Sequence, residues 1–510
     1  MKHFKKIMAL ALAGLALASC VNPSKTSEPS GDSGSKTVTI GYTQFPANVD
    51  PAAEYNGWFT VRYGVGETLF KMDDKLEVKP WLAEKIEAVS DLEWKITLKD
   101  KVTFQNGEKM TGEKVKASLE RLIKTSERAA SDMGIDSISA EGQTVTIKTK
   151  AVQPIMANLL AEPYSAIVDT TGKSASDKAP VGTGPYMVTK YTPESGAELK
   201  AYDDYWDGKP KVANLKIKYF SDPTAISAAL KSKEVDAVYG LPYANLSTYA
   251  SDKNYKISAV EGSRYLAYYY NFENPYVADD KFRQALDTLV DKKTYSESLF
   301  KGSAVPAVGP FPKGFAFALQ KSVHEFNVEK AKKLLDEAGL KDKDGDGLRE
   351  DKNGNKLTFN FAIRNTGQDF DQALADTFIK SWKEVGLDVK LVDGKLMAPK
   401  DWSQRVQGDD PGIDIFQGAW GLGTDPNASS LVGKSTPLNY QRYTTEEIQK
   451  SLDAMGSSDM FDDKKLVEAY QKFDKQFRED AAWLPFSWKS DLTWVNKRIK
   501  NLDVEKLNLG

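Results

Sequence analysis

The stretch Asp369–Val392, DFDQALADTFIKSWKEVGLDVKLV, decides the fold class because it places a helix and a strand almost directly after one another. Its first part has an apolar residue at every third or fourth position, which predicts a helix with one buried face: Phe370, Leu374, Phe378, Trp382 and Val385. Gly386 is a typical helix stop, and residues 387–392 then read as a strand. Such helix and strand pairs indicate an α/β protein.

The same mixture continues along the chain in both directions. Short alternating strands are predicted at Thr37–Ile40 and Trp94–Lys99. Thr111 is a predicted N-cap, and Asn327 opens another helix that Gly339 ends. The apolar stripes of these two helices are Val115, Leu119, Leu122 and Ile123 in the first and Val328, Ala331, Leu334, Leu335 and Ala338 in the second. No internal repeat is present, so we predict a mixed α/β fold.

The first twenty residues follow the pattern of a bacterial signal peptide. Three of the first six residues are lysines, Ile7–Ala18 is apolar, and small residues precede Cys20. The apolar run is shorter than the ~20 residues that span a bilayer as a helix. Residues 17–20, LASC, resemble a lipoprotein box, in which the chain is cut before a cysteine that then carries lipid. Cys20 is the only cysteine, so an internal disulfide is excluded, and the alternative role is a small buried side chain.

Size and charge restrict the partners. A chain of 510 residues, 41% of them hydrophobic, is expected to divide into two or three globular units. The formal net charge is −3 and no block of like charges occurs, which argues against nucleic acid as a partner. No later segment has eighteen consecutive apolar residues, so membrane contact is expected only through the lipid anchor.

The sequence has little histidine and lacks several common catalytic motifs. Histidine occurs only at positions 3 and 324, and neither G-x-S-x-G nor H-E-x-x-H is present. Gly433-Lys434-Ser435 lacks the leading glycine of a phosphate-binding loop, and Gly182-Thr183-Gly184 lacks the third glycine of a dinucleotide-binding motif. A glycosidase with paired carboxylates stays open among 72 acidic residues, although solvated surface charge explains nearly all of them. We predict that the protein is not an enzyme.

A candidate calcium loop lies between the predicted helix that ends at Gly339 and a predicted strand over 357–361. Residues 342–347, DKDGDG, match the first half of such a loop, with carboxylates at Asp342, Asp344 and Asp346. Glu350 occupies position nine, but position twelve is Asn353, where a bidentate glutamate is expected. Two interpretations stay open, a structural Ca²⁺ ion or a polar turn, and no other cofactor is predicted.

A glycine-dense segment, Gly418–Asn427 (GAWGLGTDPN), follows a predicted apolar strand over 413–416. Glycine permits close approach of a second backbone, and Pro426 fixes the exit from the turn. Trp420 would supply one aromatic wall and Asp425 one negative charge, which suits an extended ligand with a positive end. The alternative is a surface loop in which Trp420 is core and Asp425 begins a turn.

Further motifs occur in a fixed order, and together they carry a family resemblance. They are Trp94–Leu98, Phe104-Gln105-Asn106-Gly107, Met110-Thr111, Gly182-Thr183-Gly184-Pro185-Tyr186, Tyr205-Trp206-Asp207-Gly208-Lys209-Pro210, Ala229-Leu230, Glu234-Val235-Asp236-Ala237 and Phe282-Arg283-Gln284-Ala285-Leu286. From about Val38 to Leu507 the chain resembles the extracytoplasmic solute-binding proteins of the dipeptide, oligopeptide and nickel family, family 5, which are receptors of ABC importers. Each motif alone is weak, but the shared order is specific.

The resemblance implies a two-lobed Venus flytrap of the type II periplasmic-binding-protein kind, with an extra inserted domain. Ser263–Phe272 and Ala482–Val495 would cross between the lobes. The implied boundaries are 1–19 signal peptide, 20–36 flexible tether, 37–72 first segment of lobe I, 73–182 inserted domain II, 183–272 second segment of lobe I, 273–481 lobe III and 482–510 last segment of lobe I.

The resemblance also implies a function outside the cytoplasm of a bacterium. A lipid-anchored monomer would capture an oligopeptide between closing lobes and deliver it to the permease subunits of an ABC transporter. The alternative ligand within the family is nickel or a metallophore chelate, and the alternative outside it is a cell-surface hydrolase.

In oligopeptide receptors of this family, an aspartate shortly after a tryptophan pairs with the peptide's α-amino group. Here Gly423 stands three residues after Trp420, which departs from the enteric pattern, whereas Asp425-Pro426 resembles Gram-positive relatives. The resemblance therefore implies that Asp425 has this role. Four further aromatic residues are candidate pocket walls, with core packing as the alternative for each: Tyr42, Trp58, Tyr243 and Tyr269.

Overall fold

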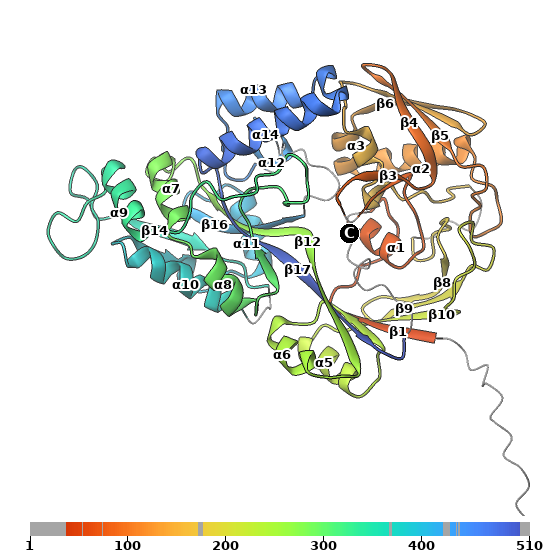
Figure 1. The fold of residues 1–510 in the computed structure, drawn as a ribbon, viewed down its shortest axis with the longest axis horizontal. Helices are drawn as coiled ribbons and strands as arrows, with labels where there is room; N and C mark the ends of the chain where they lie inside the picture. The colour runs from red at the N-terminus through yellow and green to blue at the C-terminus, as the bar shows by residue number, and fades with distance from the viewer. Residues whose placement is uncertain are drawn as a thin grey trace, which may run out of the picture. The chain divides into compact units, whose positions relative to one another are not determined.

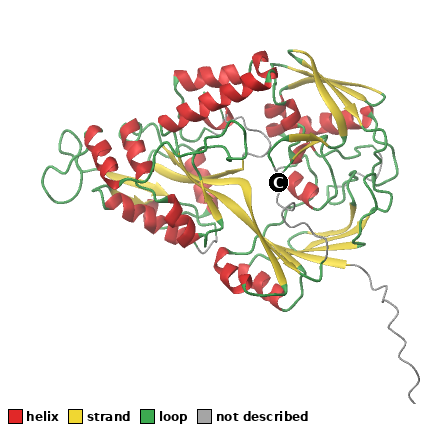
Figure 2. Ribbon diagram, viewed as in Figure 1, coloured by secondary structure: helices red, strands yellow, loops and turns green. Residues whose placement is uncertain are grey.

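The computed structural model describes residues 37–499, except for residues 54, 74, 172–176, 367–369, 422–428, 435 and 437–438. The predicted signal peptide, the tether and Cys20 lie outside these residues. Helices and strands are mixed along the whole described chain (Figure 2), and the predicted α/β class is confirmed. Within the described part, no helix combines the length and the apolar character needed to cross a membrane.

One 11-stranded sheet organises the chain, in the order β15-β14-β16-β12-β17-β11-β1-β10-β9-β8, with β13 paired to β17. Its strands are β1 (Thr37–Tyr42), β8 (Tyr186–Thr192), β9 (Gly196–Ala201), β10 (Asn214–Tyr219), β11 (Ala237–Tyr239), β12 (Tyr255–Tyr270), β13 (Ala304–Pro306), β14 (Thr358–Ala362), β15 (Asp388–Leu391), β16 (Ile415–Gly421) and β17 (Leu484–Asn496). We call β1 and β8–β11 the first half-sheet and β14–β16 the second half-sheet.

Two long strands, β12 and β17, connect the half-sheets (Figure 1). They pair antiparallel from Tyr255↔Asn496 to Tyr268↔Leu484, with a break in register between Glu261 and Tyr265. On one side of the break β17 pairs with β11, and on the other side β12 pairs with β16. The break therefore lies where the sheet passes from one half to the other. The predicted crossing segment 482–495 contains all of β17 except Asn496, whereas 263–272 contains only the second half of β12, which begins eight residues earlier than expected.

A separate four-stranded antiparallel sheet has the order β4-β5-β7-β6, with β4 (Ala83–Ser90), β5 (Glu93–Leu98), β6 (Ile135–Glu141) and β7 (Thr144–Thr149). The alternation predicted for residues 94–98 is confirmed, since Trp94, Ile96 and Leu98 are buried and Lys95 is exposed. The three buried side chains pack in one core with helix α2 (Gly112–Thr125). Thr111 caps this helix by accepting the Lys114 backbone N–H at 3.4 Å. A two-stranded sheet, β2 (Phe70–Met72) and β3 (Val78–Pro80), precedes the four-stranded sheet in the chain.

The remaining described elements are helices. The α-helices are α1 (Asn56–Arg62), α3 (Glu127–Met133), α4 (Met156–Leu159), α5 (Pro223–Lys231), α6 (Leu246–Ala250), α7 (Asp280–Thr288), α8 (Lys292–Leu299), α9 (Val328–Glu337), α10 (Asp371–Lys383), α11 (Pro399–Gln407), α12 (Ser429–Val432), α13 (Glu446–Met455) and α14 (Asp463–Glu479). Short 3₁₀ turns are η1 (Pro163–Ser165), η2 (Tyr243–Asn245), η3 (Val392–Gly394) and η4 (Ser458–Phe461).

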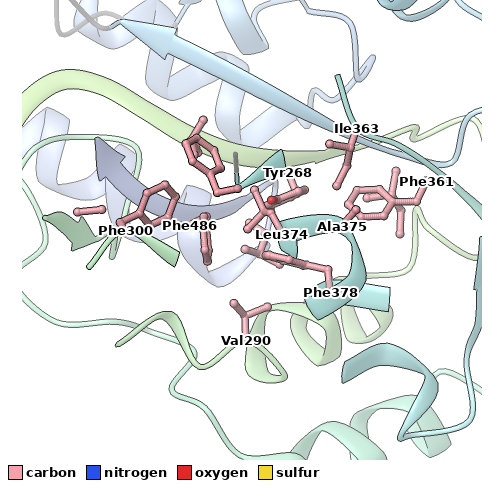
Figure 3. Packing of buried hydrophobic residues seen from close by; sticks show 14 of the residues in the cluster. Tyr268, Val290, Phe300, Phe361, Ile363, Leu374, Ala375, Phe378 and Phe486 are labelled. Atoms are coloured by element: carbon pink, nitrogen blue, oxygen red, sulfur yellow. The ribbon is translucent and has the colours of Figure 1, made fainter. Parts of the chain in front are cut away.

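The predicted buried face of α10 is the centre of the largest core. Phe378 packs between strands: its ring centroid lies 4.2 Å from that of Tyr268 on β12 and 5.3 Å from that of Phe486 on β17 (Figure 3). Trp382 packs beside it on Phe361 of β14, at 5.1 Å. The predicted cap Asn327 on α9 is also confirmed, because its side chain accepts the Lys330 N–H at 2.9 Å.

Buried charges join α7, α8 and α14. The side chains of Asp287 and Arg478 have no exposed surface, and Arg478 donates to the Asp287 carboxylate. Lys292 Nζ lies 3.0 Å from the other oxygen of that carboxylate. Arg478 also donates to the carbonyl oxygens of Val308 (3.1 Å) and Trp483 (2.7 Å). Each charge in this cluster is thus balanced or hydrogen-bonded, as burial requires.

Three of the sequence motifs meet at one place beside β8. Gly182 and Gly184 lie so close to residues 64–66 that a Cβ atom would stand 1.9 Å from the Val65 oxygen and 2.3 Å from the Gly64 oxygen, respectively. Gln105 bridges the two segments, since its Nε2 donates to the carbonyl oxygens of Val65 and Gly184, both at 3.0 Å. The glycines of this motif therefore permit a backbone crossing.

The same crossing buries one carboxylate, that of Glu67. It accepts hydrogen bonds from Thr183 Oγ1 (2.8 Å), Tyr205 OH (2.5 Å) and Trp206 Nε1 (2.8 Å). Burial outweighs these hydrogen bonds and raises the pKa of Glu67 above its ordinary value. The motifs at 182–186 and 205–210 thus serve one packing arrangement, and Glu67 lies outside both motifs.

Replacing Thr183 with valine tests this arrangement. The side chain is fully buried, so the variant keeps its volume and removes one hydrogen bond to a carboxylate. We expect the free energy of unfolding to fall by about 1.5–3 kcal/mol, measured by urea denaturation. Thr189→Val is the control, because the Thr189 hydroxyl donates to Glu198 O in an exposed pair on β8 and β9. Equal losses of unfolding free energy in the two variants would contradict a stabilising role of the hydrogen bond from Thr183 to Glu67.

Candidate ligand-binding site

Parallel strands of the first half-sheet end in a row of tyrosines. Strand β1 runs parallel to β10 and β11, and the register places Tyr42 beside Tyr219 on one side and Tyr239 on the other. The Tyr42 and Tyr239 ring centroids are 5.5 Å apart. In open α/β sheets, ligands bind at the carboxyl ends of the strands, which is where these three residues stand.

One positive charge faces this row. The Arg62 guanidinium, at the end of α1, lies 4.6 Å from the ring centroid of Tyr239 and 5.6 Å from that of Phe59. Burial raises the pKa of Tyr42, and Arg62 partly opposes this shift. Tyr42 is therefore a neutral hydroxyl at neutral pH, next to a half-buried cation.

The second half-sheet ends in a comparable way. Strands β14 and β16 run parallel, and the chain leaves β14 through Ile363 and Arg364. The half-buried Arg364 guanidinium lies 5.6 Å from the ring centroid of Trp402 on α11. Strand β16 ends at Gly421, immediately before residues 422–428. In the described residues, an arginine thus lies near the carboxyl ends of the parallel strands of each half-sheet, against tyrosine in the first and against Trp402 of α11 in the second.

The glycine-dense segment begins as strand rather than as loop, which corrects the expectation for its first four residues. Strand β16 continues to Gly421, so Gly418 and Trp420 pair with β12, opposite Ala267 and Tyr265. The physical reason is the pairing of these residues with β12. Gly418 leaves room for the Tyr269 ring, because a Cβ atom at this position would stand 2.4 Å from that ring. Gly423 and Asp425 lie outside the described residues, so their predicted ligand contacts stay predictions.

The four aromatic candidates do not lie together. Tyr42, Trp58, Tyr243 and Tyr269 belong to or flank four different hydrophobic clusters. Tyr243 is 2% exposed and its hydroxyl donates to Ser490 O at 2.7 Å. Tyr269 is 4% exposed, and its ring centroid lies 5.0 Å from that of Trp483. For these two residues the packing matches the core alternative.

Trp58 is half-buried at the edge of the core around the four-stranded sheet. The Arg128 guanidinium lies 5.4 Å from its ring centroid and 5.5 Å from that of Tyr164. Of the four candidates, only Tyr42 stands at the carboxyl end of a parallel strand. The sequence did not lead to the prediction of four other residues at the strand ends: Tyr219, Tyr239, Arg62 and Arg364. The position of the two tyrosines at the ends of strands could have indicated them, whereas no sequence signal marked the arginines.

The four predicted calcium ligands do lie together. One carboxylate oxygen from each of Asp342, Asp344, Asp346 and Glu350 falls within 4.8 Å of the others. Among the described residues the group contains no histidine; His324 is buried elsewhere, with its Nε2 2.8 Å from Arg478 O. The only histidine after the predicted signal peptide is thus engaged in the core.

Comparison with known families identifies the fold. The family model described as "Bacterial extracellular solute-binding proteins, family 5 Middle" matches residues 77–441. The nickel-binding protein NikA of Staphylococcus aureus is 32% identical over 336 residues, which cover 66% of each chain. The oligopeptide-binding protein OppA of Lactococcus lactis is 25% identical over 396 residues, covering 71% of this chain and 65% of its own. The matches thus span about two thirds of these relatives.

Solved structures agree with the fold. A nickel ABC transporter protein from Bacillus halodurans superposes with a TM-score of 0.77 at 26% identity, over 91% of this chain and 96% of its own. NikA from Staphylococcus aureus, in complex with Ni(L-His)2, superposes with a TM-score of 0.75 at 25% identity, over 93% of this chain and 98% of its own. AppA from Bacillus subtilis, in complex with a nonapeptide, superposes with a TM-score of 0.72 at 22% identity, over 93% of this chain and 97% of its own. At this identity the likeness concerns the fold alone. The predicted two-lobed type II fold is confirmed.

Proposed function

Because the chain belongs to the bacterial extracellular solute-binding proteins of family 5, we propose that it is the receptor of an ABC importer and that its ligand is an oligopeptide. The main support for receptor function is the match of the family model to residues 77–441. The fold supports it, since β12 and β17 link the two half-sheets in the described part of the chain, and such a scaffold can close about its connections. The predicted domain boundaries form part of this proposal.

The choice of an oligopeptide rests on the chemistry of the strand ends. Asp425, shortly after the end of β16, would pair with the ammonium of a peptide. Arg62 and Arg364 would offer positive charge to carboxylates, and the tyrosine row would offer apolar walls with polar tips. Contacts to the peptide backbone would add affinity that does not depend on its side chains. Such a site would accept peptides of varied sequence.

A nickel chelate is the second candidate, because NikA of Staphylococcus aureus is named a nickel-binding protein and is 32% identical. His324 is buried in the core and offers no imidazole to an incoming ion. A chelate that brings its own nitrogen ligands would avoid this requirement, and its carboxylates would suit the same arginines. A cell-surface hydrolase has no comparable support from the relatives.

Two measurements test the proposal and separate the candidates. Native mass spectrometry of the protein as purified should show bound masses that correspond to peptides. After the bound material has been removed by unfolding and refolding, calorimetry should show binding of free-amine peptides. Binding of Ni(L-His)2 and of no peptide would overturn the oligopeptide assignment and leave receptor function in place.

The predicted anchor has its own test. Cys20→Ala should abolish incorporation of labelled palmitate and leave the protein uncut or released from the cell, because no other cysteine is available for lipid. Processing at residues 19 and 20 can be followed by mass. Label that persists in the variant would contradict the proposed anchor, whereas receptor function would be unaffected.

A further inference from the structure

The connection between α9 and β14 has a defined shape. It is closed at its base, where Lys341 and Glu350 exchange backbone hydrogen bonds of 3.0 and 2.9 Å. The Asp342 carboxylate accepts the backbone N–H groups of Gly345 at 2.7 Å and Gly347 at 3.0 Å. Gly345 and Gly347 have φ values of +80° and +89°, which favour glycine. The turn brings Asp342, Asp344, Asp346 and Glu350 within 4.8 Å of one another.

Glu350 differs from the three aspartates because it is buried. The residue is 2% exposed, whereas the aspartates are exposed. One of its oxygens, Oε2, accepts the Lys343 N–H at 2.8 Å. The other, Oε1, is buried and has no hydrogen-bond partner within the part of the chain that the structure describes. A buried carboxylate oxygen without a partner is costly, so this geometry favours a cation as the partner of Glu350.

The cations nearby do not satisfy this requirement. Lys356 is ion-paired with Asp346, and its Nζ lies 3.1 Å from Asp344 Oδ2. Lys343 Nζ donates to the carbonyl oxygens of Asp351 and Lys352, and Arg349 donates to Asp336 and to the carbonyl oxygens of Leu340 and Val385. Among the described residues, Lys356 is ion-paired with two of the four carboxylates, Asp344 and Asp346, whereas Asp342 and Glu350 accept only backbone N–H groups. The four carboxylates therefore carry an excess of negative charge.

We propose that the loop Asp342–Glu350 binds one Ca²⁺ ion through Asp342, Asp344, Asp346 and Glu350. An all-oxygen set of carboxylates suits a hard cation, and Ca²⁺ accepts 6–8 oxygen ligands in variable geometry, whereas Mg²⁺ requires a near-ideal octahedron. Glu350 takes the place of the glutamate that a complete EF-hand loop carries at position twelve. The ion would fix the connection between α9 and the second half-sheet.

Titration with CaCl2 tests the site in the whole protein after treatment with EDTA. Calorimetry should show one ion bound per chain with a Kd of about 10⁻⁴–10⁻³ M, the range of extracellular calcium modules. The same titration with MgCl2 should show at least tenfold weaker binding. Calcium should also raise the melting temperature relative to EGTA, because it binds the folded state.

Three variants make the result specific. Glu350→Gln and Asp344→Asn should each weaken calcium binding at least tenfold and remove the rise in melting temperature. Asp344 is exposed, so this variant tests binding even where Glu350→Gln disturbs folding. Glu337→Gln, on α9, removes an exposed carboxylate outside the cluster and should leave binding unchanged. Absence of calcium binding, or equal binding by the wild type and Asp344→Asn, overturns the proposal.

Discussion

Replacing Asp287 with alanine is expected to lower the free energy of unfolding by about 3–5 kcal/mol, because it leaves two buried cations without their carboxylate. Arg478 has no exposed side-chain surface, and Lys292 is 9% exposed, so neither can recover its hydration in place. Arg478, Lys292 and Asp287 come from α14, α8 and α7, respectively, so the cluster links three helices. Urea denaturation followed by tryptophan fluorescence measures the change.

The pH dependence of this effect has a defined sign. Burial opposes the shift, but Lys292 and Arg478 hold the pKa of Asp287 below its ordinary value. A carboxyl with a lowered pKa stabilises the folded state above the unfolded pKa of about 3.9, and this contribution is lost as the pH falls through the folded pKa. The difference between wild type and variant should therefore be full at neutral pH and shrink in strong acid.

An exposed pair provides the control for Asp287. Lys465 Nζ and Asp459 Oδ1 are 2.6 Å apart, but both side chains are more than half exposed. Asp459→Ala should change the free energy of unfolding by less than about 1 kcal/mol, as for other surface ion pairs. A loss of the same small size in Asp287→Ala would mean that the buried cluster does not depend on its carboxylate.

Replacing Asp425 with alanine is expected to weaken binding of a free-amine peptide by about 2–5 kcal/mol, the usual cost of leaving one buried charge without its partner. The prediction rests on the proposed oligopeptide ligand and on the position of Asp425 after Trp420 in the sequence. The ligand can close the protein only through contacts that are stronger in the closed state. A pair between Asp425 and the peptide ammonium would be one such contact.

A double comparison isolates this contact. An N-acetylated peptide of the same sequence should bind weakly to the wild type, and Asp425→Ala should weaken that binding much less. Calorimetry on the four combinations of protein and peptide gives the coupling between the two groups. If acetylation has no effect on the wild type, Asp425 does not hold the amino group.

Local signals in the sequence predicted the elements well. Thr111 and Asn327 cap the helices as expected, since a cap needs only the three residues that follow it. The alternation in residues 94–98 correctly indicated one buried face of a sheet. The strand before Trp420 was predicted too short, because its continuation depends on pairing with β12, about 150 residues away in the sequence.

The candidate sites could be predicted only in part, because some of their residues are brought together by strands that are far apart in the sequence. The quartet of Asp342, Asp344, Asp346 and Glu350 was visible because its members are adjacent in the chain. The tyrosine row was not, because Tyr42, Tyr219 and Tyr239 become neighbours only through the register of three parallel strands. Aromatic residues chosen singly, such as Tyr243 and Tyr269, proved to be buried in separate cores.

The place of β17 in the sheet has a consequence for the order of folding. This strand, Leu484–Asn496, lies near the end of the chain, yet it pairs with β11, β12 and β13 in the interior of the sheet. Until it has been synthesised, β11 and β12 each lack a neighbour, and the link between the half-sheets is incomplete. Contacts of such long sequence separation form slowly. A chain that must leave the cytoplasm before it folds, as the predicted signal peptide requires, would gain time for export from this late strand.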